Sequence, residues 1–341
     1  MWRGDFKIVN TSLKTIKNMI DDIGFINHNL ISINDLSNEM ILELFKLANC
    51  LQPWYRSRLN ILSGKHMATL FFQPSTRTRL SFETAMSRLG GTIISEATPL
   101  ISSSAAKEES LNDMIKVVSQ YANIIVLRHP SADEAKDAVT YSDCPVISGA
   151  FGHEEHPTQA LLDLYTLWQT FGKIEGLKVC IATPDLIHAR TGHSMAYALA
   201  RLGAKVYLLS KKEYRTPNFV MENIRKINGD VEEVFDLNQK QFNEFIYTNA
   251  DLVYLPGCSA PKGEDAEKFK QIMDNYFVQY ETIEKANKEK NKIIYVTHTL
   301  PRRKGEMDLR IDKSSAELYF KAIAYSVAIR MALILAIIGF E

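Results

Sequence analysis

Residues 71–91 place an apolar strand, a turn of hydroxyl and arginine side chains, and an amphipathic helix in direct succession, FFQPSTRTRLSFETAMSRLGG. The first N–H groups of a helix have no partner within the helix, and the helix dipole is positive there, so an anion is favoured. An ordinary helix cap with solvated arginines is the alternative, but it needs only one hydroxyl. The turn therefore predicts a phosphate site. The residues that would add hydrogen bonds to that phosphate are Ser75, Thr76, Arg77 and Thr78.

The core of this turn, S-T-R-T-R, resembles the carbamoyl-phosphate motif of the aspartate and ornithine carbamoyltransferase family. The residues on either side of it resemble the aspartate branch, and other segments match in the family's order along nearly the whole chain. Those segments are NHNLISINDLS at 27–37, SQYANIIVLRHP at 119–130, HPTQALLDLYT at 156–166, DLIHARTGHS at 185–194 and HTLPR at 298–302. By these motifs the chain is identified as a member of the family, which implies carbamoyl transfer from carbamoyl phosphate without a metal or organic cofactor.

The resemblance also implies how the carbamoyl donor would be held. Arg128 would reach both the phosphate and the carbonyl oxygen, while His156 would polarise that carbonyl together with Thr78 and Arg128. His156 stands at a predicted helix start, where the dipole disfavours the imidazolium and lets a neutral ring donate to an oxyanion. Gln159, one turn later, would bind the carbamoyl nitrogen. The implied catalytic residues are Arg77, Thr78, Arg128 and His156.

Small and polar residues at 101–110, ISSSAAKEES, predict a loop. In the family, a serine and a lysine of this loop complete the active site of the neighbouring subunit, and these would be Ser103 and Lys107. The resemblance therefore implies a homotrimer with shared sites. The family often has two adjacent lysines here, whereas this chain has Ala106 before Lys107. A solvated loop without catalytic duty is the alternative.

The binding site for the amine acceptor is implied by two other motifs. In the aspartate branch, the arginine that corresponds to Arg190 grips a carboxylate, for which a guanidinium has the right fork geometry. The backbone carbonyls of Thr299 and Leu300 would accept hydrogen bonds from the carbamoyl amine. The residues that the resemblance assigns to the amino acid, or that could replace missing ones, are Lys107, Arg190, Lys262 and Leu300.

Two departures from the aspartate branch concern this acceptor. Aspartate members place an arginine and a glutamine after the strand that here reads DLVY, yet this chain continues LPGCSAPKGE. A buried side-chain carboxylate without that arginine would lose several kcal/mol unless Lys262, Arg302 or Arg303 replaces it. Gln73 also stands where a glutamate commonly orients the substrate-binding arginines. The cysteine of the ornithine signature H-C-L-P is absent as well.

These observations leave several functions open. The default acceptor is L-aspartate, which would give N-carbamoyl-L-aspartate and phosphate in pyrimidine biosynthesis. The altered loop at 256–263 favours the alternative of a related transferase for another small amino acid or an amide. A non-catalytic paralogue that binds carbamoyl phosphate is a further alternative. A nucleotide-binding dehydrogenase is disfavoured because the strand at 177–183 is followed by PDLIHARTG rather than G-x-G-x-x-G.

Elements of alternating type must position these residues. Strands are predicted at 66–72, 91–97, 123–129 and 144–150 and again at 177–183, 204–210, 251–257 and 292–298. Helices are predicted between them, including one within 31–51 that follows an Asn-Asp-Leu-Ser start. Such alternation predicts an α/β fold of two doubly wound parallel-sheet domains joined by interdomain helices. The predicted domains are 1–155 for carbamoyl phosphate and 156–313 for the amino acid, with a C-terminal helix at 314–341 packing back on the first. Both substrates would bind beyond the carboxyl ends of these strands.

Composition excludes several classes of protein. The 341 residues are 46% hydrophobic and 23% charged, which is typical of globular proteins rather than disordered ones. Because 40 basic and 40 acidic residues cancel, no bulk charge favours nucleic acid. The four cysteines lack a C-x-x-C and the N-terminus lacks a signal sequence, so a cytoplasmic protein with reduced thiols is expected. Arg330 interrupts the apolar run at 324–340, which predicts a buried helix rather than a membrane anchor. A regulatory subunit cannot be read from the sequence.

Overall fold

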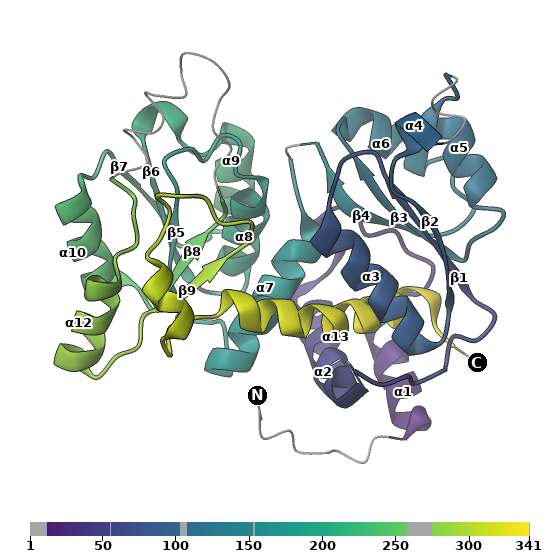
Figure 1. Cartoon of the computed structure of the whole chain (residues 1–341), viewed down its shortest axis with the longest axis horizontal. Helices are drawn as coiled ribbons and strands as arrows, with labels where there is room; N and C mark the ends of the chain where they lie inside the picture. Colours follow the sequence, from purple (N-terminus) through teal and green to yellow (C-terminus); the bar gives the residue numbers. More distant parts are fainter. Residues whose placement is uncertain (1–11, 55, 103–107, 153, 258–274, 341) are drawn as a thin grey trace. The chain divides into compact units, whose positions relative to one another are not determined.

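The computed structural model describes residues 12–54, 56–102, 108–152, 154–257 and 275–340. The chain divides into two compact units, Met1–Tyr165 with Ala324–Glu341, and Thr166–Ile323. Each unit is built around its own parallel sheet with helices on both faces (Figure 1). This confirms the predicted α/β class with two parallel-sheet domains. The division falls at 165 rather than at the predicted 155, because the helix that begins after His156 belongs to the first unit for most of its length.

The sheet of the first unit has the strand order β2-β1-β3-β4, with every neighbouring pair parallel. Its strands are β1 (His66–Phe71), β2 (Thr92–Glu96), β3 (Ile124–His129) and β4 (Val146–Phe151). Phe71 lies beside Arg128, and His129 lies beside Phe151. The carboxyl ends of three adjacent strands therefore meet at one edge, and the residues that follow them share that edge.

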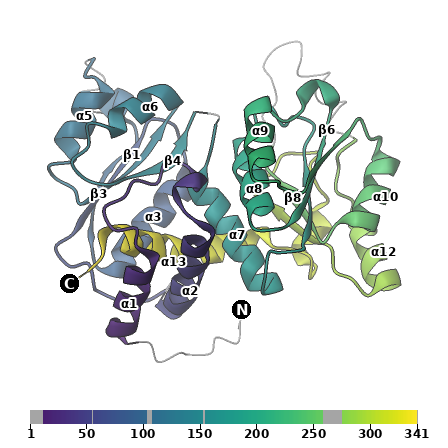
Figure 2. The same ribbon diagram turned by 180° about the vertical axis from the view of Figure 1, so that it is seen from behind.

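Helices cover both faces of this sheet. One face is covered by α5 (Leu111–Val118) and α6 (Ala132–Val139), which bury Ile115 and Ala138 against Leu70 and Ile125 (Figure 2). The other helical segments of the unit are α1 (Leu13–Ile23), η1 (Ile33–Asp35), α2 (Asn38–Leu51), η2 (Gln52–Trp54), α3 (Thr76–Leu89) and α4 (Pro99–Ser102). Apolar side chains fill the interior on both sides, as strands covered on two faces require.

The helix predicted to follow the Asn-Asp-Leu-Ser start within 31–51 is confirmed as α2, and a short turn precedes it. Ser32 and Asp35 form a capping box that closes the short turn η1, after which Leu36 is extended. Ser37 then begins α2 by accepting a hydrogen bond from the backbone N–H of Met40. Two consecutive caps divide the segment because each serine favours a non-helical backbone at its own position.

The second unit repeats this architecture with the strand order β7-β6-β5-β8-β9, also entirely parallel. Its strands are β5 (Lys178–Ala182), β6 (Lys205–Ser210), β7 (Val231–Phe235), β8 (Leu252–Leu255) and β9 (Tyr295–His298). Its helical segments are α8 (Arg190–Arg201), η4 (Lys212–Tyr214), α9 (Asn218–Lys226), α10 (Gln239–Asn249), α12 (Tyr280–Lys290) and η5 (Leu309–Lys313). One face packs on α10 and α12 through Phe242, Ile246 and Ile283.

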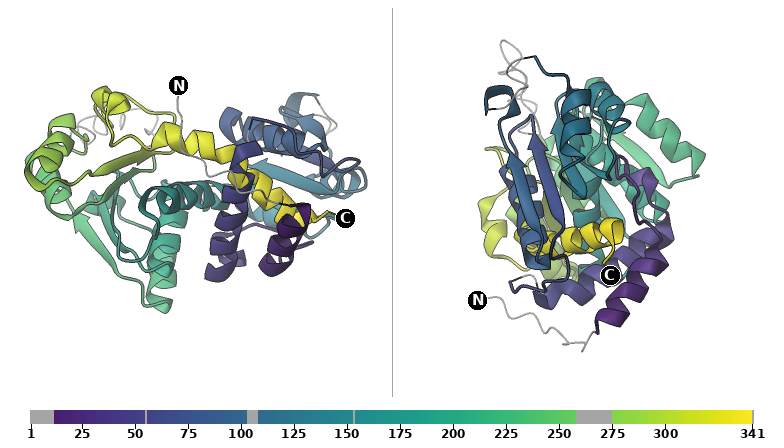
Figure 3. Two further views of the ribbon diagram at one scale, coloured as in Figure 1. Left: turned by 90° about the horizontal axis from the view of Figure 1, so that it is seen from below. Right: turned by 90° about the vertical axis from the view of Figure 1, so that its right-hand side faces the viewer.

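Two helices, α7 (Pro157–Phe171) and α13 (Tyr319–Ile338), contribute residues to both units, which agrees with the predicted interdomain helices. At the far end of α13 the carbonyl of Ile337 accepts a hydrogen bond from the N–H of Asn27 (2.9 Å; α13 is yellow in Figure 3). In the described part of the chain α13 alone is long and apolar enough to cross a membrane, and 67% of its most apolar window is buried within the protein. It is a core helix, as the arginine inside it predicted.

Candidate functional site

The turn between β1 and α3 has the features of an anion site. Ser75 occupies the N-cap position of α3, yet its hydroxyl makes no capping hydrogen bond, and no acidic residue lies in the first helical turn. At the starts of α2, α5 and α10, by contrast, Ser37, Ser110 and Asn238 accept from the backbone. The N–H groups of this turn therefore keep their capacity to bind an anion.

The side chains of this turn divide into two groups. Arg77 is exposed, and partial desolvation by the surrounding chain lowers its pKa from the ordinary value, while it stays a cation at neutral pH. Thr78 is buried at the same helix start. Arg79 instead donates to the carboxylate of Glu83 (3.3 Å), which also accepts from Thr69 of β1 (3.0 Å). The second arginine of the motif thus ties α3 to the sheet, and Arg77 is the exposed cation at the helix start.

Arg128 ends β3 beside this turn. Its side chain is buried, and Nη1 donates to the carbonyl of Gly149 on β4 (2.9 Å). Gly149 allows this approach because a Cβ there would lie 3.2 Å from the carbonyl oxygen of Leu127 and 3.4 Å from the Cβ of Arg128. One end of the guanidinium is therefore fixed to β4, in register with the end of β1.

A half-buried carboxylate fixes the segment that leads to His156. Glu155 accepts from the hydroxyl of Ser32 (2.8 Å) and from the N–H of Ile33 (3.2 Å). Burial raises the pKa of Glu155 above its usual range. His156 follows at the start of α7, where it is buried and its Nδ1 lies 3.5 Å from the hydroxyl of Thr158. The loop of the 27–37 motif thus supports the histidine from a distant part of the sequence.

Gln159 is held by a residue that sequence reasoning missed. Its Nε2 donates to Oδ1 of Asp163 (3.0 Å), one turn along α7. Because the acidic partner binds the NH₂ end of the amide, the carbonyl end is the one left to meet a ligand that donates hydrogen bonds. Asp163 also stabilises the buried cation of Arg330 on α13, and desolvation lowers the pKa of that arginine to about 10. The Asp163 carboxylate therefore orients Gln159 and partly compensates the charge of Arg330.

In the second unit, Arg190 begins α8 directly after the β5 loop. The side chain is half-buried, and burial lowers its pKa from the ordinary value, although the group stays protonated. The next residue, Thr191, donates to the carbonyl of Pro256 (3.2 Å), as does Thr299 (2.7 Å). These two hydroxyls tie the ends of β5, β8 and β9 together at the carboxyl edge of the second sheet.

The turn after β9 is braced by a buried histidine and glutamate. Nδ1 of His298 accepts from the N–H of Leu300 (2.7 Å), and its Nε2 lies 2.9 Å from Oε2 of Glu306. An imidazole that accepts at Nδ1 carries its proton at Nε2, so the ring is neutral and donates to the carboxylate. Glu306 also accepts from the N–H of Arg303 (2.5 Å). This brace holds Leu300 in the left-handed region at φ 57°, which is strained for a residue with a side chain.

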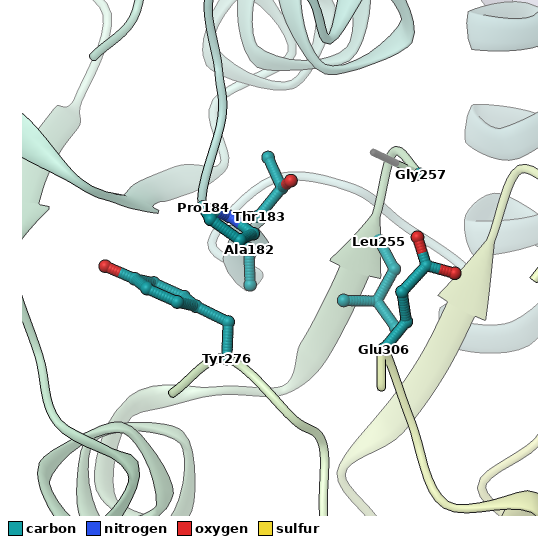
Figure 4. Close-up of a pocket in the computed structure, with 7 residues that line it drawn as sticks. All are labelled: Ala182, Thr183, Pro184, Leu255, Gly257, Tyr276 and Glu306. Carbon is teal, nitrogen blue, oxygen red and sulfur yellow. The ribbon is translucent and has the colours of Figure 1, made fainter. Parts of the chain in front are cut away.

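A small pocket opens at the carboxyl ends of β5 and β8, with about 230 Å³ of unfilled space that includes its solvent-open part (Figure 4). Its lining residues are Ala182, Thr183, Pro184, Leu255, Gly257, Tyr276 and Glu306. Sequence reasoning missed Thr183 and Glu306, since neither belongs to a motif. The signal in the sequence is their position after a strand of the second sheet, since Thr183 directly follows β5 and Glu306 lies in the turn region after β9.

The predicted site residues thus fall into three sets. Ser75, Thr76, Arg77, Thr78, Arg128, His156 and Gln159 follow β1, β3 and β4 at one edge of the first sheet, and Arg190, Thr299 and Leu300 follow β5 and β9 at one edge of the second. Ser103, Lys107 and Lys262 lie outside the described residues, so their roles stay predictions. Within the described residues no group of three or more His, Cys, Asp or Glu side chains is arranged to hold a metal ion.

Two family models match nearly the whole chain. The model for the carbamoyl-P binding domain of aspartate/ornithine carbamoyltransferases matches residues 28–169, and the model for their Asp/Orn binding domain matches residues 175–337. The chain belongs to the aspartate/ornithine carbamoyltransferase family. It is therefore an enzyme of the carbamoyltransferase class, as the motifs predicted.

Relatives within this family carry different acceptor names. A ureidoglycine carbamoyltransferase of Rubrobacter xylanophilus is 60% identical over 96% of this chain and 97% of its own length. The aspartate carbamoyltransferase catalytic subunit of Methanopyrus kandleri is 39% identical over 92% of this chain and 98% of its own. Among solved structures, the catalytic subunit of M. jannaschii aspartate transcarbamoylase has a TM-score of 0.79 at 38% identity, with coverage of 91% of this chain and 97% of that one.

A carbamoyltransferase fold with bound donor is also among the neighbours. Aspartate transcarbamoylase from Trypanosoma cruzi in complex with carbamoyl phosphate has a TM-score of 0.83 at 27% identity, covering 93% of this chain and 98% of that one. The family, the fold and the enzyme class are thus established for this chain. The acceptor is the property on which its relatives differ.

Proposed function

We propose that this enzyme transfers the carbamoyl group of carbamoyl phosphate to the amine of ureidoglycine. The observation that carries the proposal is the loop after β8, which lacks the arginine that aspartate-specific members use for a second carboxylate. Ureidoglycine has one carboxylate and a neutral ureido group, so it does not need that arginine. The 60% identity to a ureidoglycine carbamoyltransferase supports the same acceptor.

The proposed reaction is a nucleophilic acyl substitution. The amine nitrogen attacks the carbonyl carbon, the bond between that carbon and the phosphate oxygen breaks, and phosphate leaves with the electron pair. The amine proton is lost to phosphate or solvent, and the organic product is diureidoacetate. Arg77 and the start of α3 would hold the phosphate, while Arg128, Thr78 and His156 would stabilise the oxyanion.

The acceptor would bind through its single carboxylate to Arg190. A guanidinium pairs with a carboxylate through two parallel hydrogen bonds, which fixes the orientation of the α-carbon. The carbonyl end of Gln159 and the carbonyls of Thr299 and Leu300 would accept from the carbamoyl NH₂. L-Aspartate, the default from the sequence, is less well supported because its second carboxylate would lack the usual arginine.

Acceptor specificity can be measured as phosphate release from carbamoyl phosphate. Ureidoglycine must be prepared immediately before use, because a carbon that carries both an amine and a ureido group loses ammonia readily. Carbamoyl phosphate labelled with ¹³C should deliver its label to diureidoacetate, with aspartate, asparagine and ornithine as matched acceptors. We expect kcat/KM for ureidoglycine to exceed that for aspartate by about 100-fold or more, the factor for an unpaired buried charge. Equal or better turnover of aspartate would overturn the proposal.

We also propose that the enzyme is a cytoplasmic homotrimer whose active sites are shared between subunits. The support is the family likeness together with Ser103 and Lys107 in the 101–110 loop. Mixing inactive Arg77→Ala protein with inactive Lys107→Ala protein and allowing subunit exchange should restore activity, because some sites then combine two intact halves. A mixture that stays inactive after exchange would exclude shared sites.

A further inference from the structure

The pocket at the ends of β5 and β8 contains a buried hydroxyl with no partner. Thr183 is 4% exposed, and its Oγ1 forms no hydrogen bond to any other described residue. Its hydroxyl lies on the side of the pocket that faces Gly257 and Glu306 (Figure 4). A buried hydroxyl without a hydrogen bond costs about 1–3 kcal/mol, so such a group inside a pocket favours a ligand that forms a hydrogen bond with it.

The opposite wall of the pocket carries a negative charge. The carboxylate of Glu306 accepts from Nε2 of His298, and that ring is neutral because its Nδ1 accepts from the N–H of Leu300. This hydrogen bond therefore leaves the charge of the carboxylate in place. A carboxylate on the ligand would be repelled here, whereas the N–H groups of a neutral amide or ureido group can donate to it.

The loop after β8 contributes Gly257 to the lining of the pocket. Gly257 has φ 77°, and a Cβ at this position would lie 3.5 Å from Oγ1 of Thr299 and 3.7 Å from Cε1 of His298. A side chain here would be strained and would stand over the brace at the β9 turn. The glycine thus lines the pocket without adding a side chain to it.

From this juxtaposition we infer that Thr183 determines acceptor specificity, by binding the neutral ureido or amide group of the acceptor in the pocket that it forms with Gly257 and Glu306. The inference rests on the proposed function and names the part of the site that would read the ureido group. The Thr183 hydroxyl donates to the ureido carbonyl, and the ureido NH₂ donates to Glu306. No covalent step is involved, so Thr183 and Glu306 act on binding alone.

The inference is tested with stable acceptor analogues that lack the reactive amine. Ureidoacetate keeps the carboxylate and the ureido group, and succinate has a second carboxylate in place of the ureido group. Both are measured as inhibitors competing with the acceptor or, if no acceptor is turned over, by calorimetry in the presence of phosphate. Ureidoacetate should bind wild-type enzyme about tenfold or more tightly than succinate, as charge repulsion requires.

Thr183→Val removes the hydroxyl at nearly constant shape. It should raise the inhibition constant of ureidoacetate about tenfold, because the ureido carbonyl loses its donor, while the KM for carbamoyl phosphate stays within about twofold. Thr183→Ser retains the hydroxyl and should retain the affinity. Thr216→Val is the matched control, since Thr216 is also buried with an unpartnered hydroxyl but does not line the pocket. It should leave both constants unchanged.

Glu306→Gln tests the charge separately. Glutamine can accept from His298 and the Arg303 N–H, so the brace can form, and the preference for ureidoacetate over succinate should shrink about tenfold. Equal affinities for the two analogues in wild-type enzyme, or an unchanged ureidoacetate constant in folded Thr183→Val protein, would overturn the inference. Ureidoacetate binding that depends on Thr183 without turnover of ureidoglycine would retain the inference for another amide acceptor and refute the proposed function alone.

Discussion

Asp163 is expected to stabilise the first unit chiefly through its charge. Arg330 is buried to 3% exposure inside an apolar helix, and its guanidinium lies 5.0 Å above the ring of Phe82. Desolvation lowers the pKa of Arg330 from the ordinary arginine value to about 10, even though Asp163 opposes the shift. That lowering of the pKa corresponds to about 3 kcal/mol by which burial destabilises the charged arginine in the folded state at neutral pH. Removing the Asp163 carboxylate, which partly offsets this destabilisation, would make it larger.

The substitution Asp163→Asn keeps the shape of the side chain and removes its charge. We expect the free energy of unfolding to fall by about 3 kcal/mol, the usual result of leaving a buried charge without its partner. For a unit of this size that corresponds to a melting temperature lower by roughly 6–12 °C. Calorimetry of the variant, with and without saturating carbamoyl phosphate, measures the loss.

The double substitution Asp163→Asn with Arg330→Met isolates the charge as the cause. Methionine follows the path of the arginine stem without a charge, so most of the lost stability should return. The KM for carbamoyl phosphate should be raised in both the single and the double variant, since the introduced amide can present either oxygen or NH₂ to Gln159 and no longer fixes its orientation. An Asp163→Asn protein as stable as wild type, or a double variant no more stable than the single one, would refute the reasoning.

Three further outcomes are expected. Arg77→Ala should weaken carbamoyl phosphate binding about 100-fold or more, as measured by calorimetry. Arg79→Ala should mainly lower stability, because Arg79 pairs with Glu83. If both variants weakened binding equally, the assignment of the phosphate to Arg77 would be wrong. His156→Ala should lower kcat by about 10²–10³ with little change in donor affinity, as loss of an oxyanion donor does; a change in affinity alone would contradict this role. Burial raises the pKa of Glu155, so the folded state keeps its proton longer and stability falls as pH rises from 4.5 through the raised pKa. Glu155→Gln should remove that fall in urea denaturation at about pH 5 and about pH 8, and an unchanged slope would show that Glu155 does not cause it.

The sequence predicted the strands that form the two parallel sheets because each is a short apolar run. It did not predict β7, in which Glu232 and Glu233 interrupt the apolar pattern of an edge strand paired only with β6. The hydrogen bond between Ser32 and Glu155, which are far apart in the chain, was not predicted either. Local patterns indicate burial and helical spacing, whereas such contacts depend on the fold as a whole.

The same distinction applies to the candidate site. The residues proposed to bind a ligand stand in motifs next to strand ends, so Arg77, Arg128 and Arg190 could be named as candidates one by one. The residues that hold them carry no motif, because any acceptor or donor at the right place would serve. Glu155, Asp163 and Glu306 became visible only when the structure brought their partners together.

The separation of the two sets of ligand groups explains how an acceptor can change while the donor is kept. Most of the residues proposed to bind carbamoyl phosphate lie at strand ends of the first sheet, with Thr299 and Leu300 of the second unit as exceptions, whereas Arg190, Thr183 and Gly257 follow strands of the second sheet. A substitution at the end of β5 or β8 alters hydrogen bonding within the second unit and leaves the Arg128–Gly149 contact of the first untouched. If this reasoning is right, Thr183→Val changes the acceptor constants alone. A parallel change in carbamoyl phosphate affinity would show that the two functions are coupled through the fold.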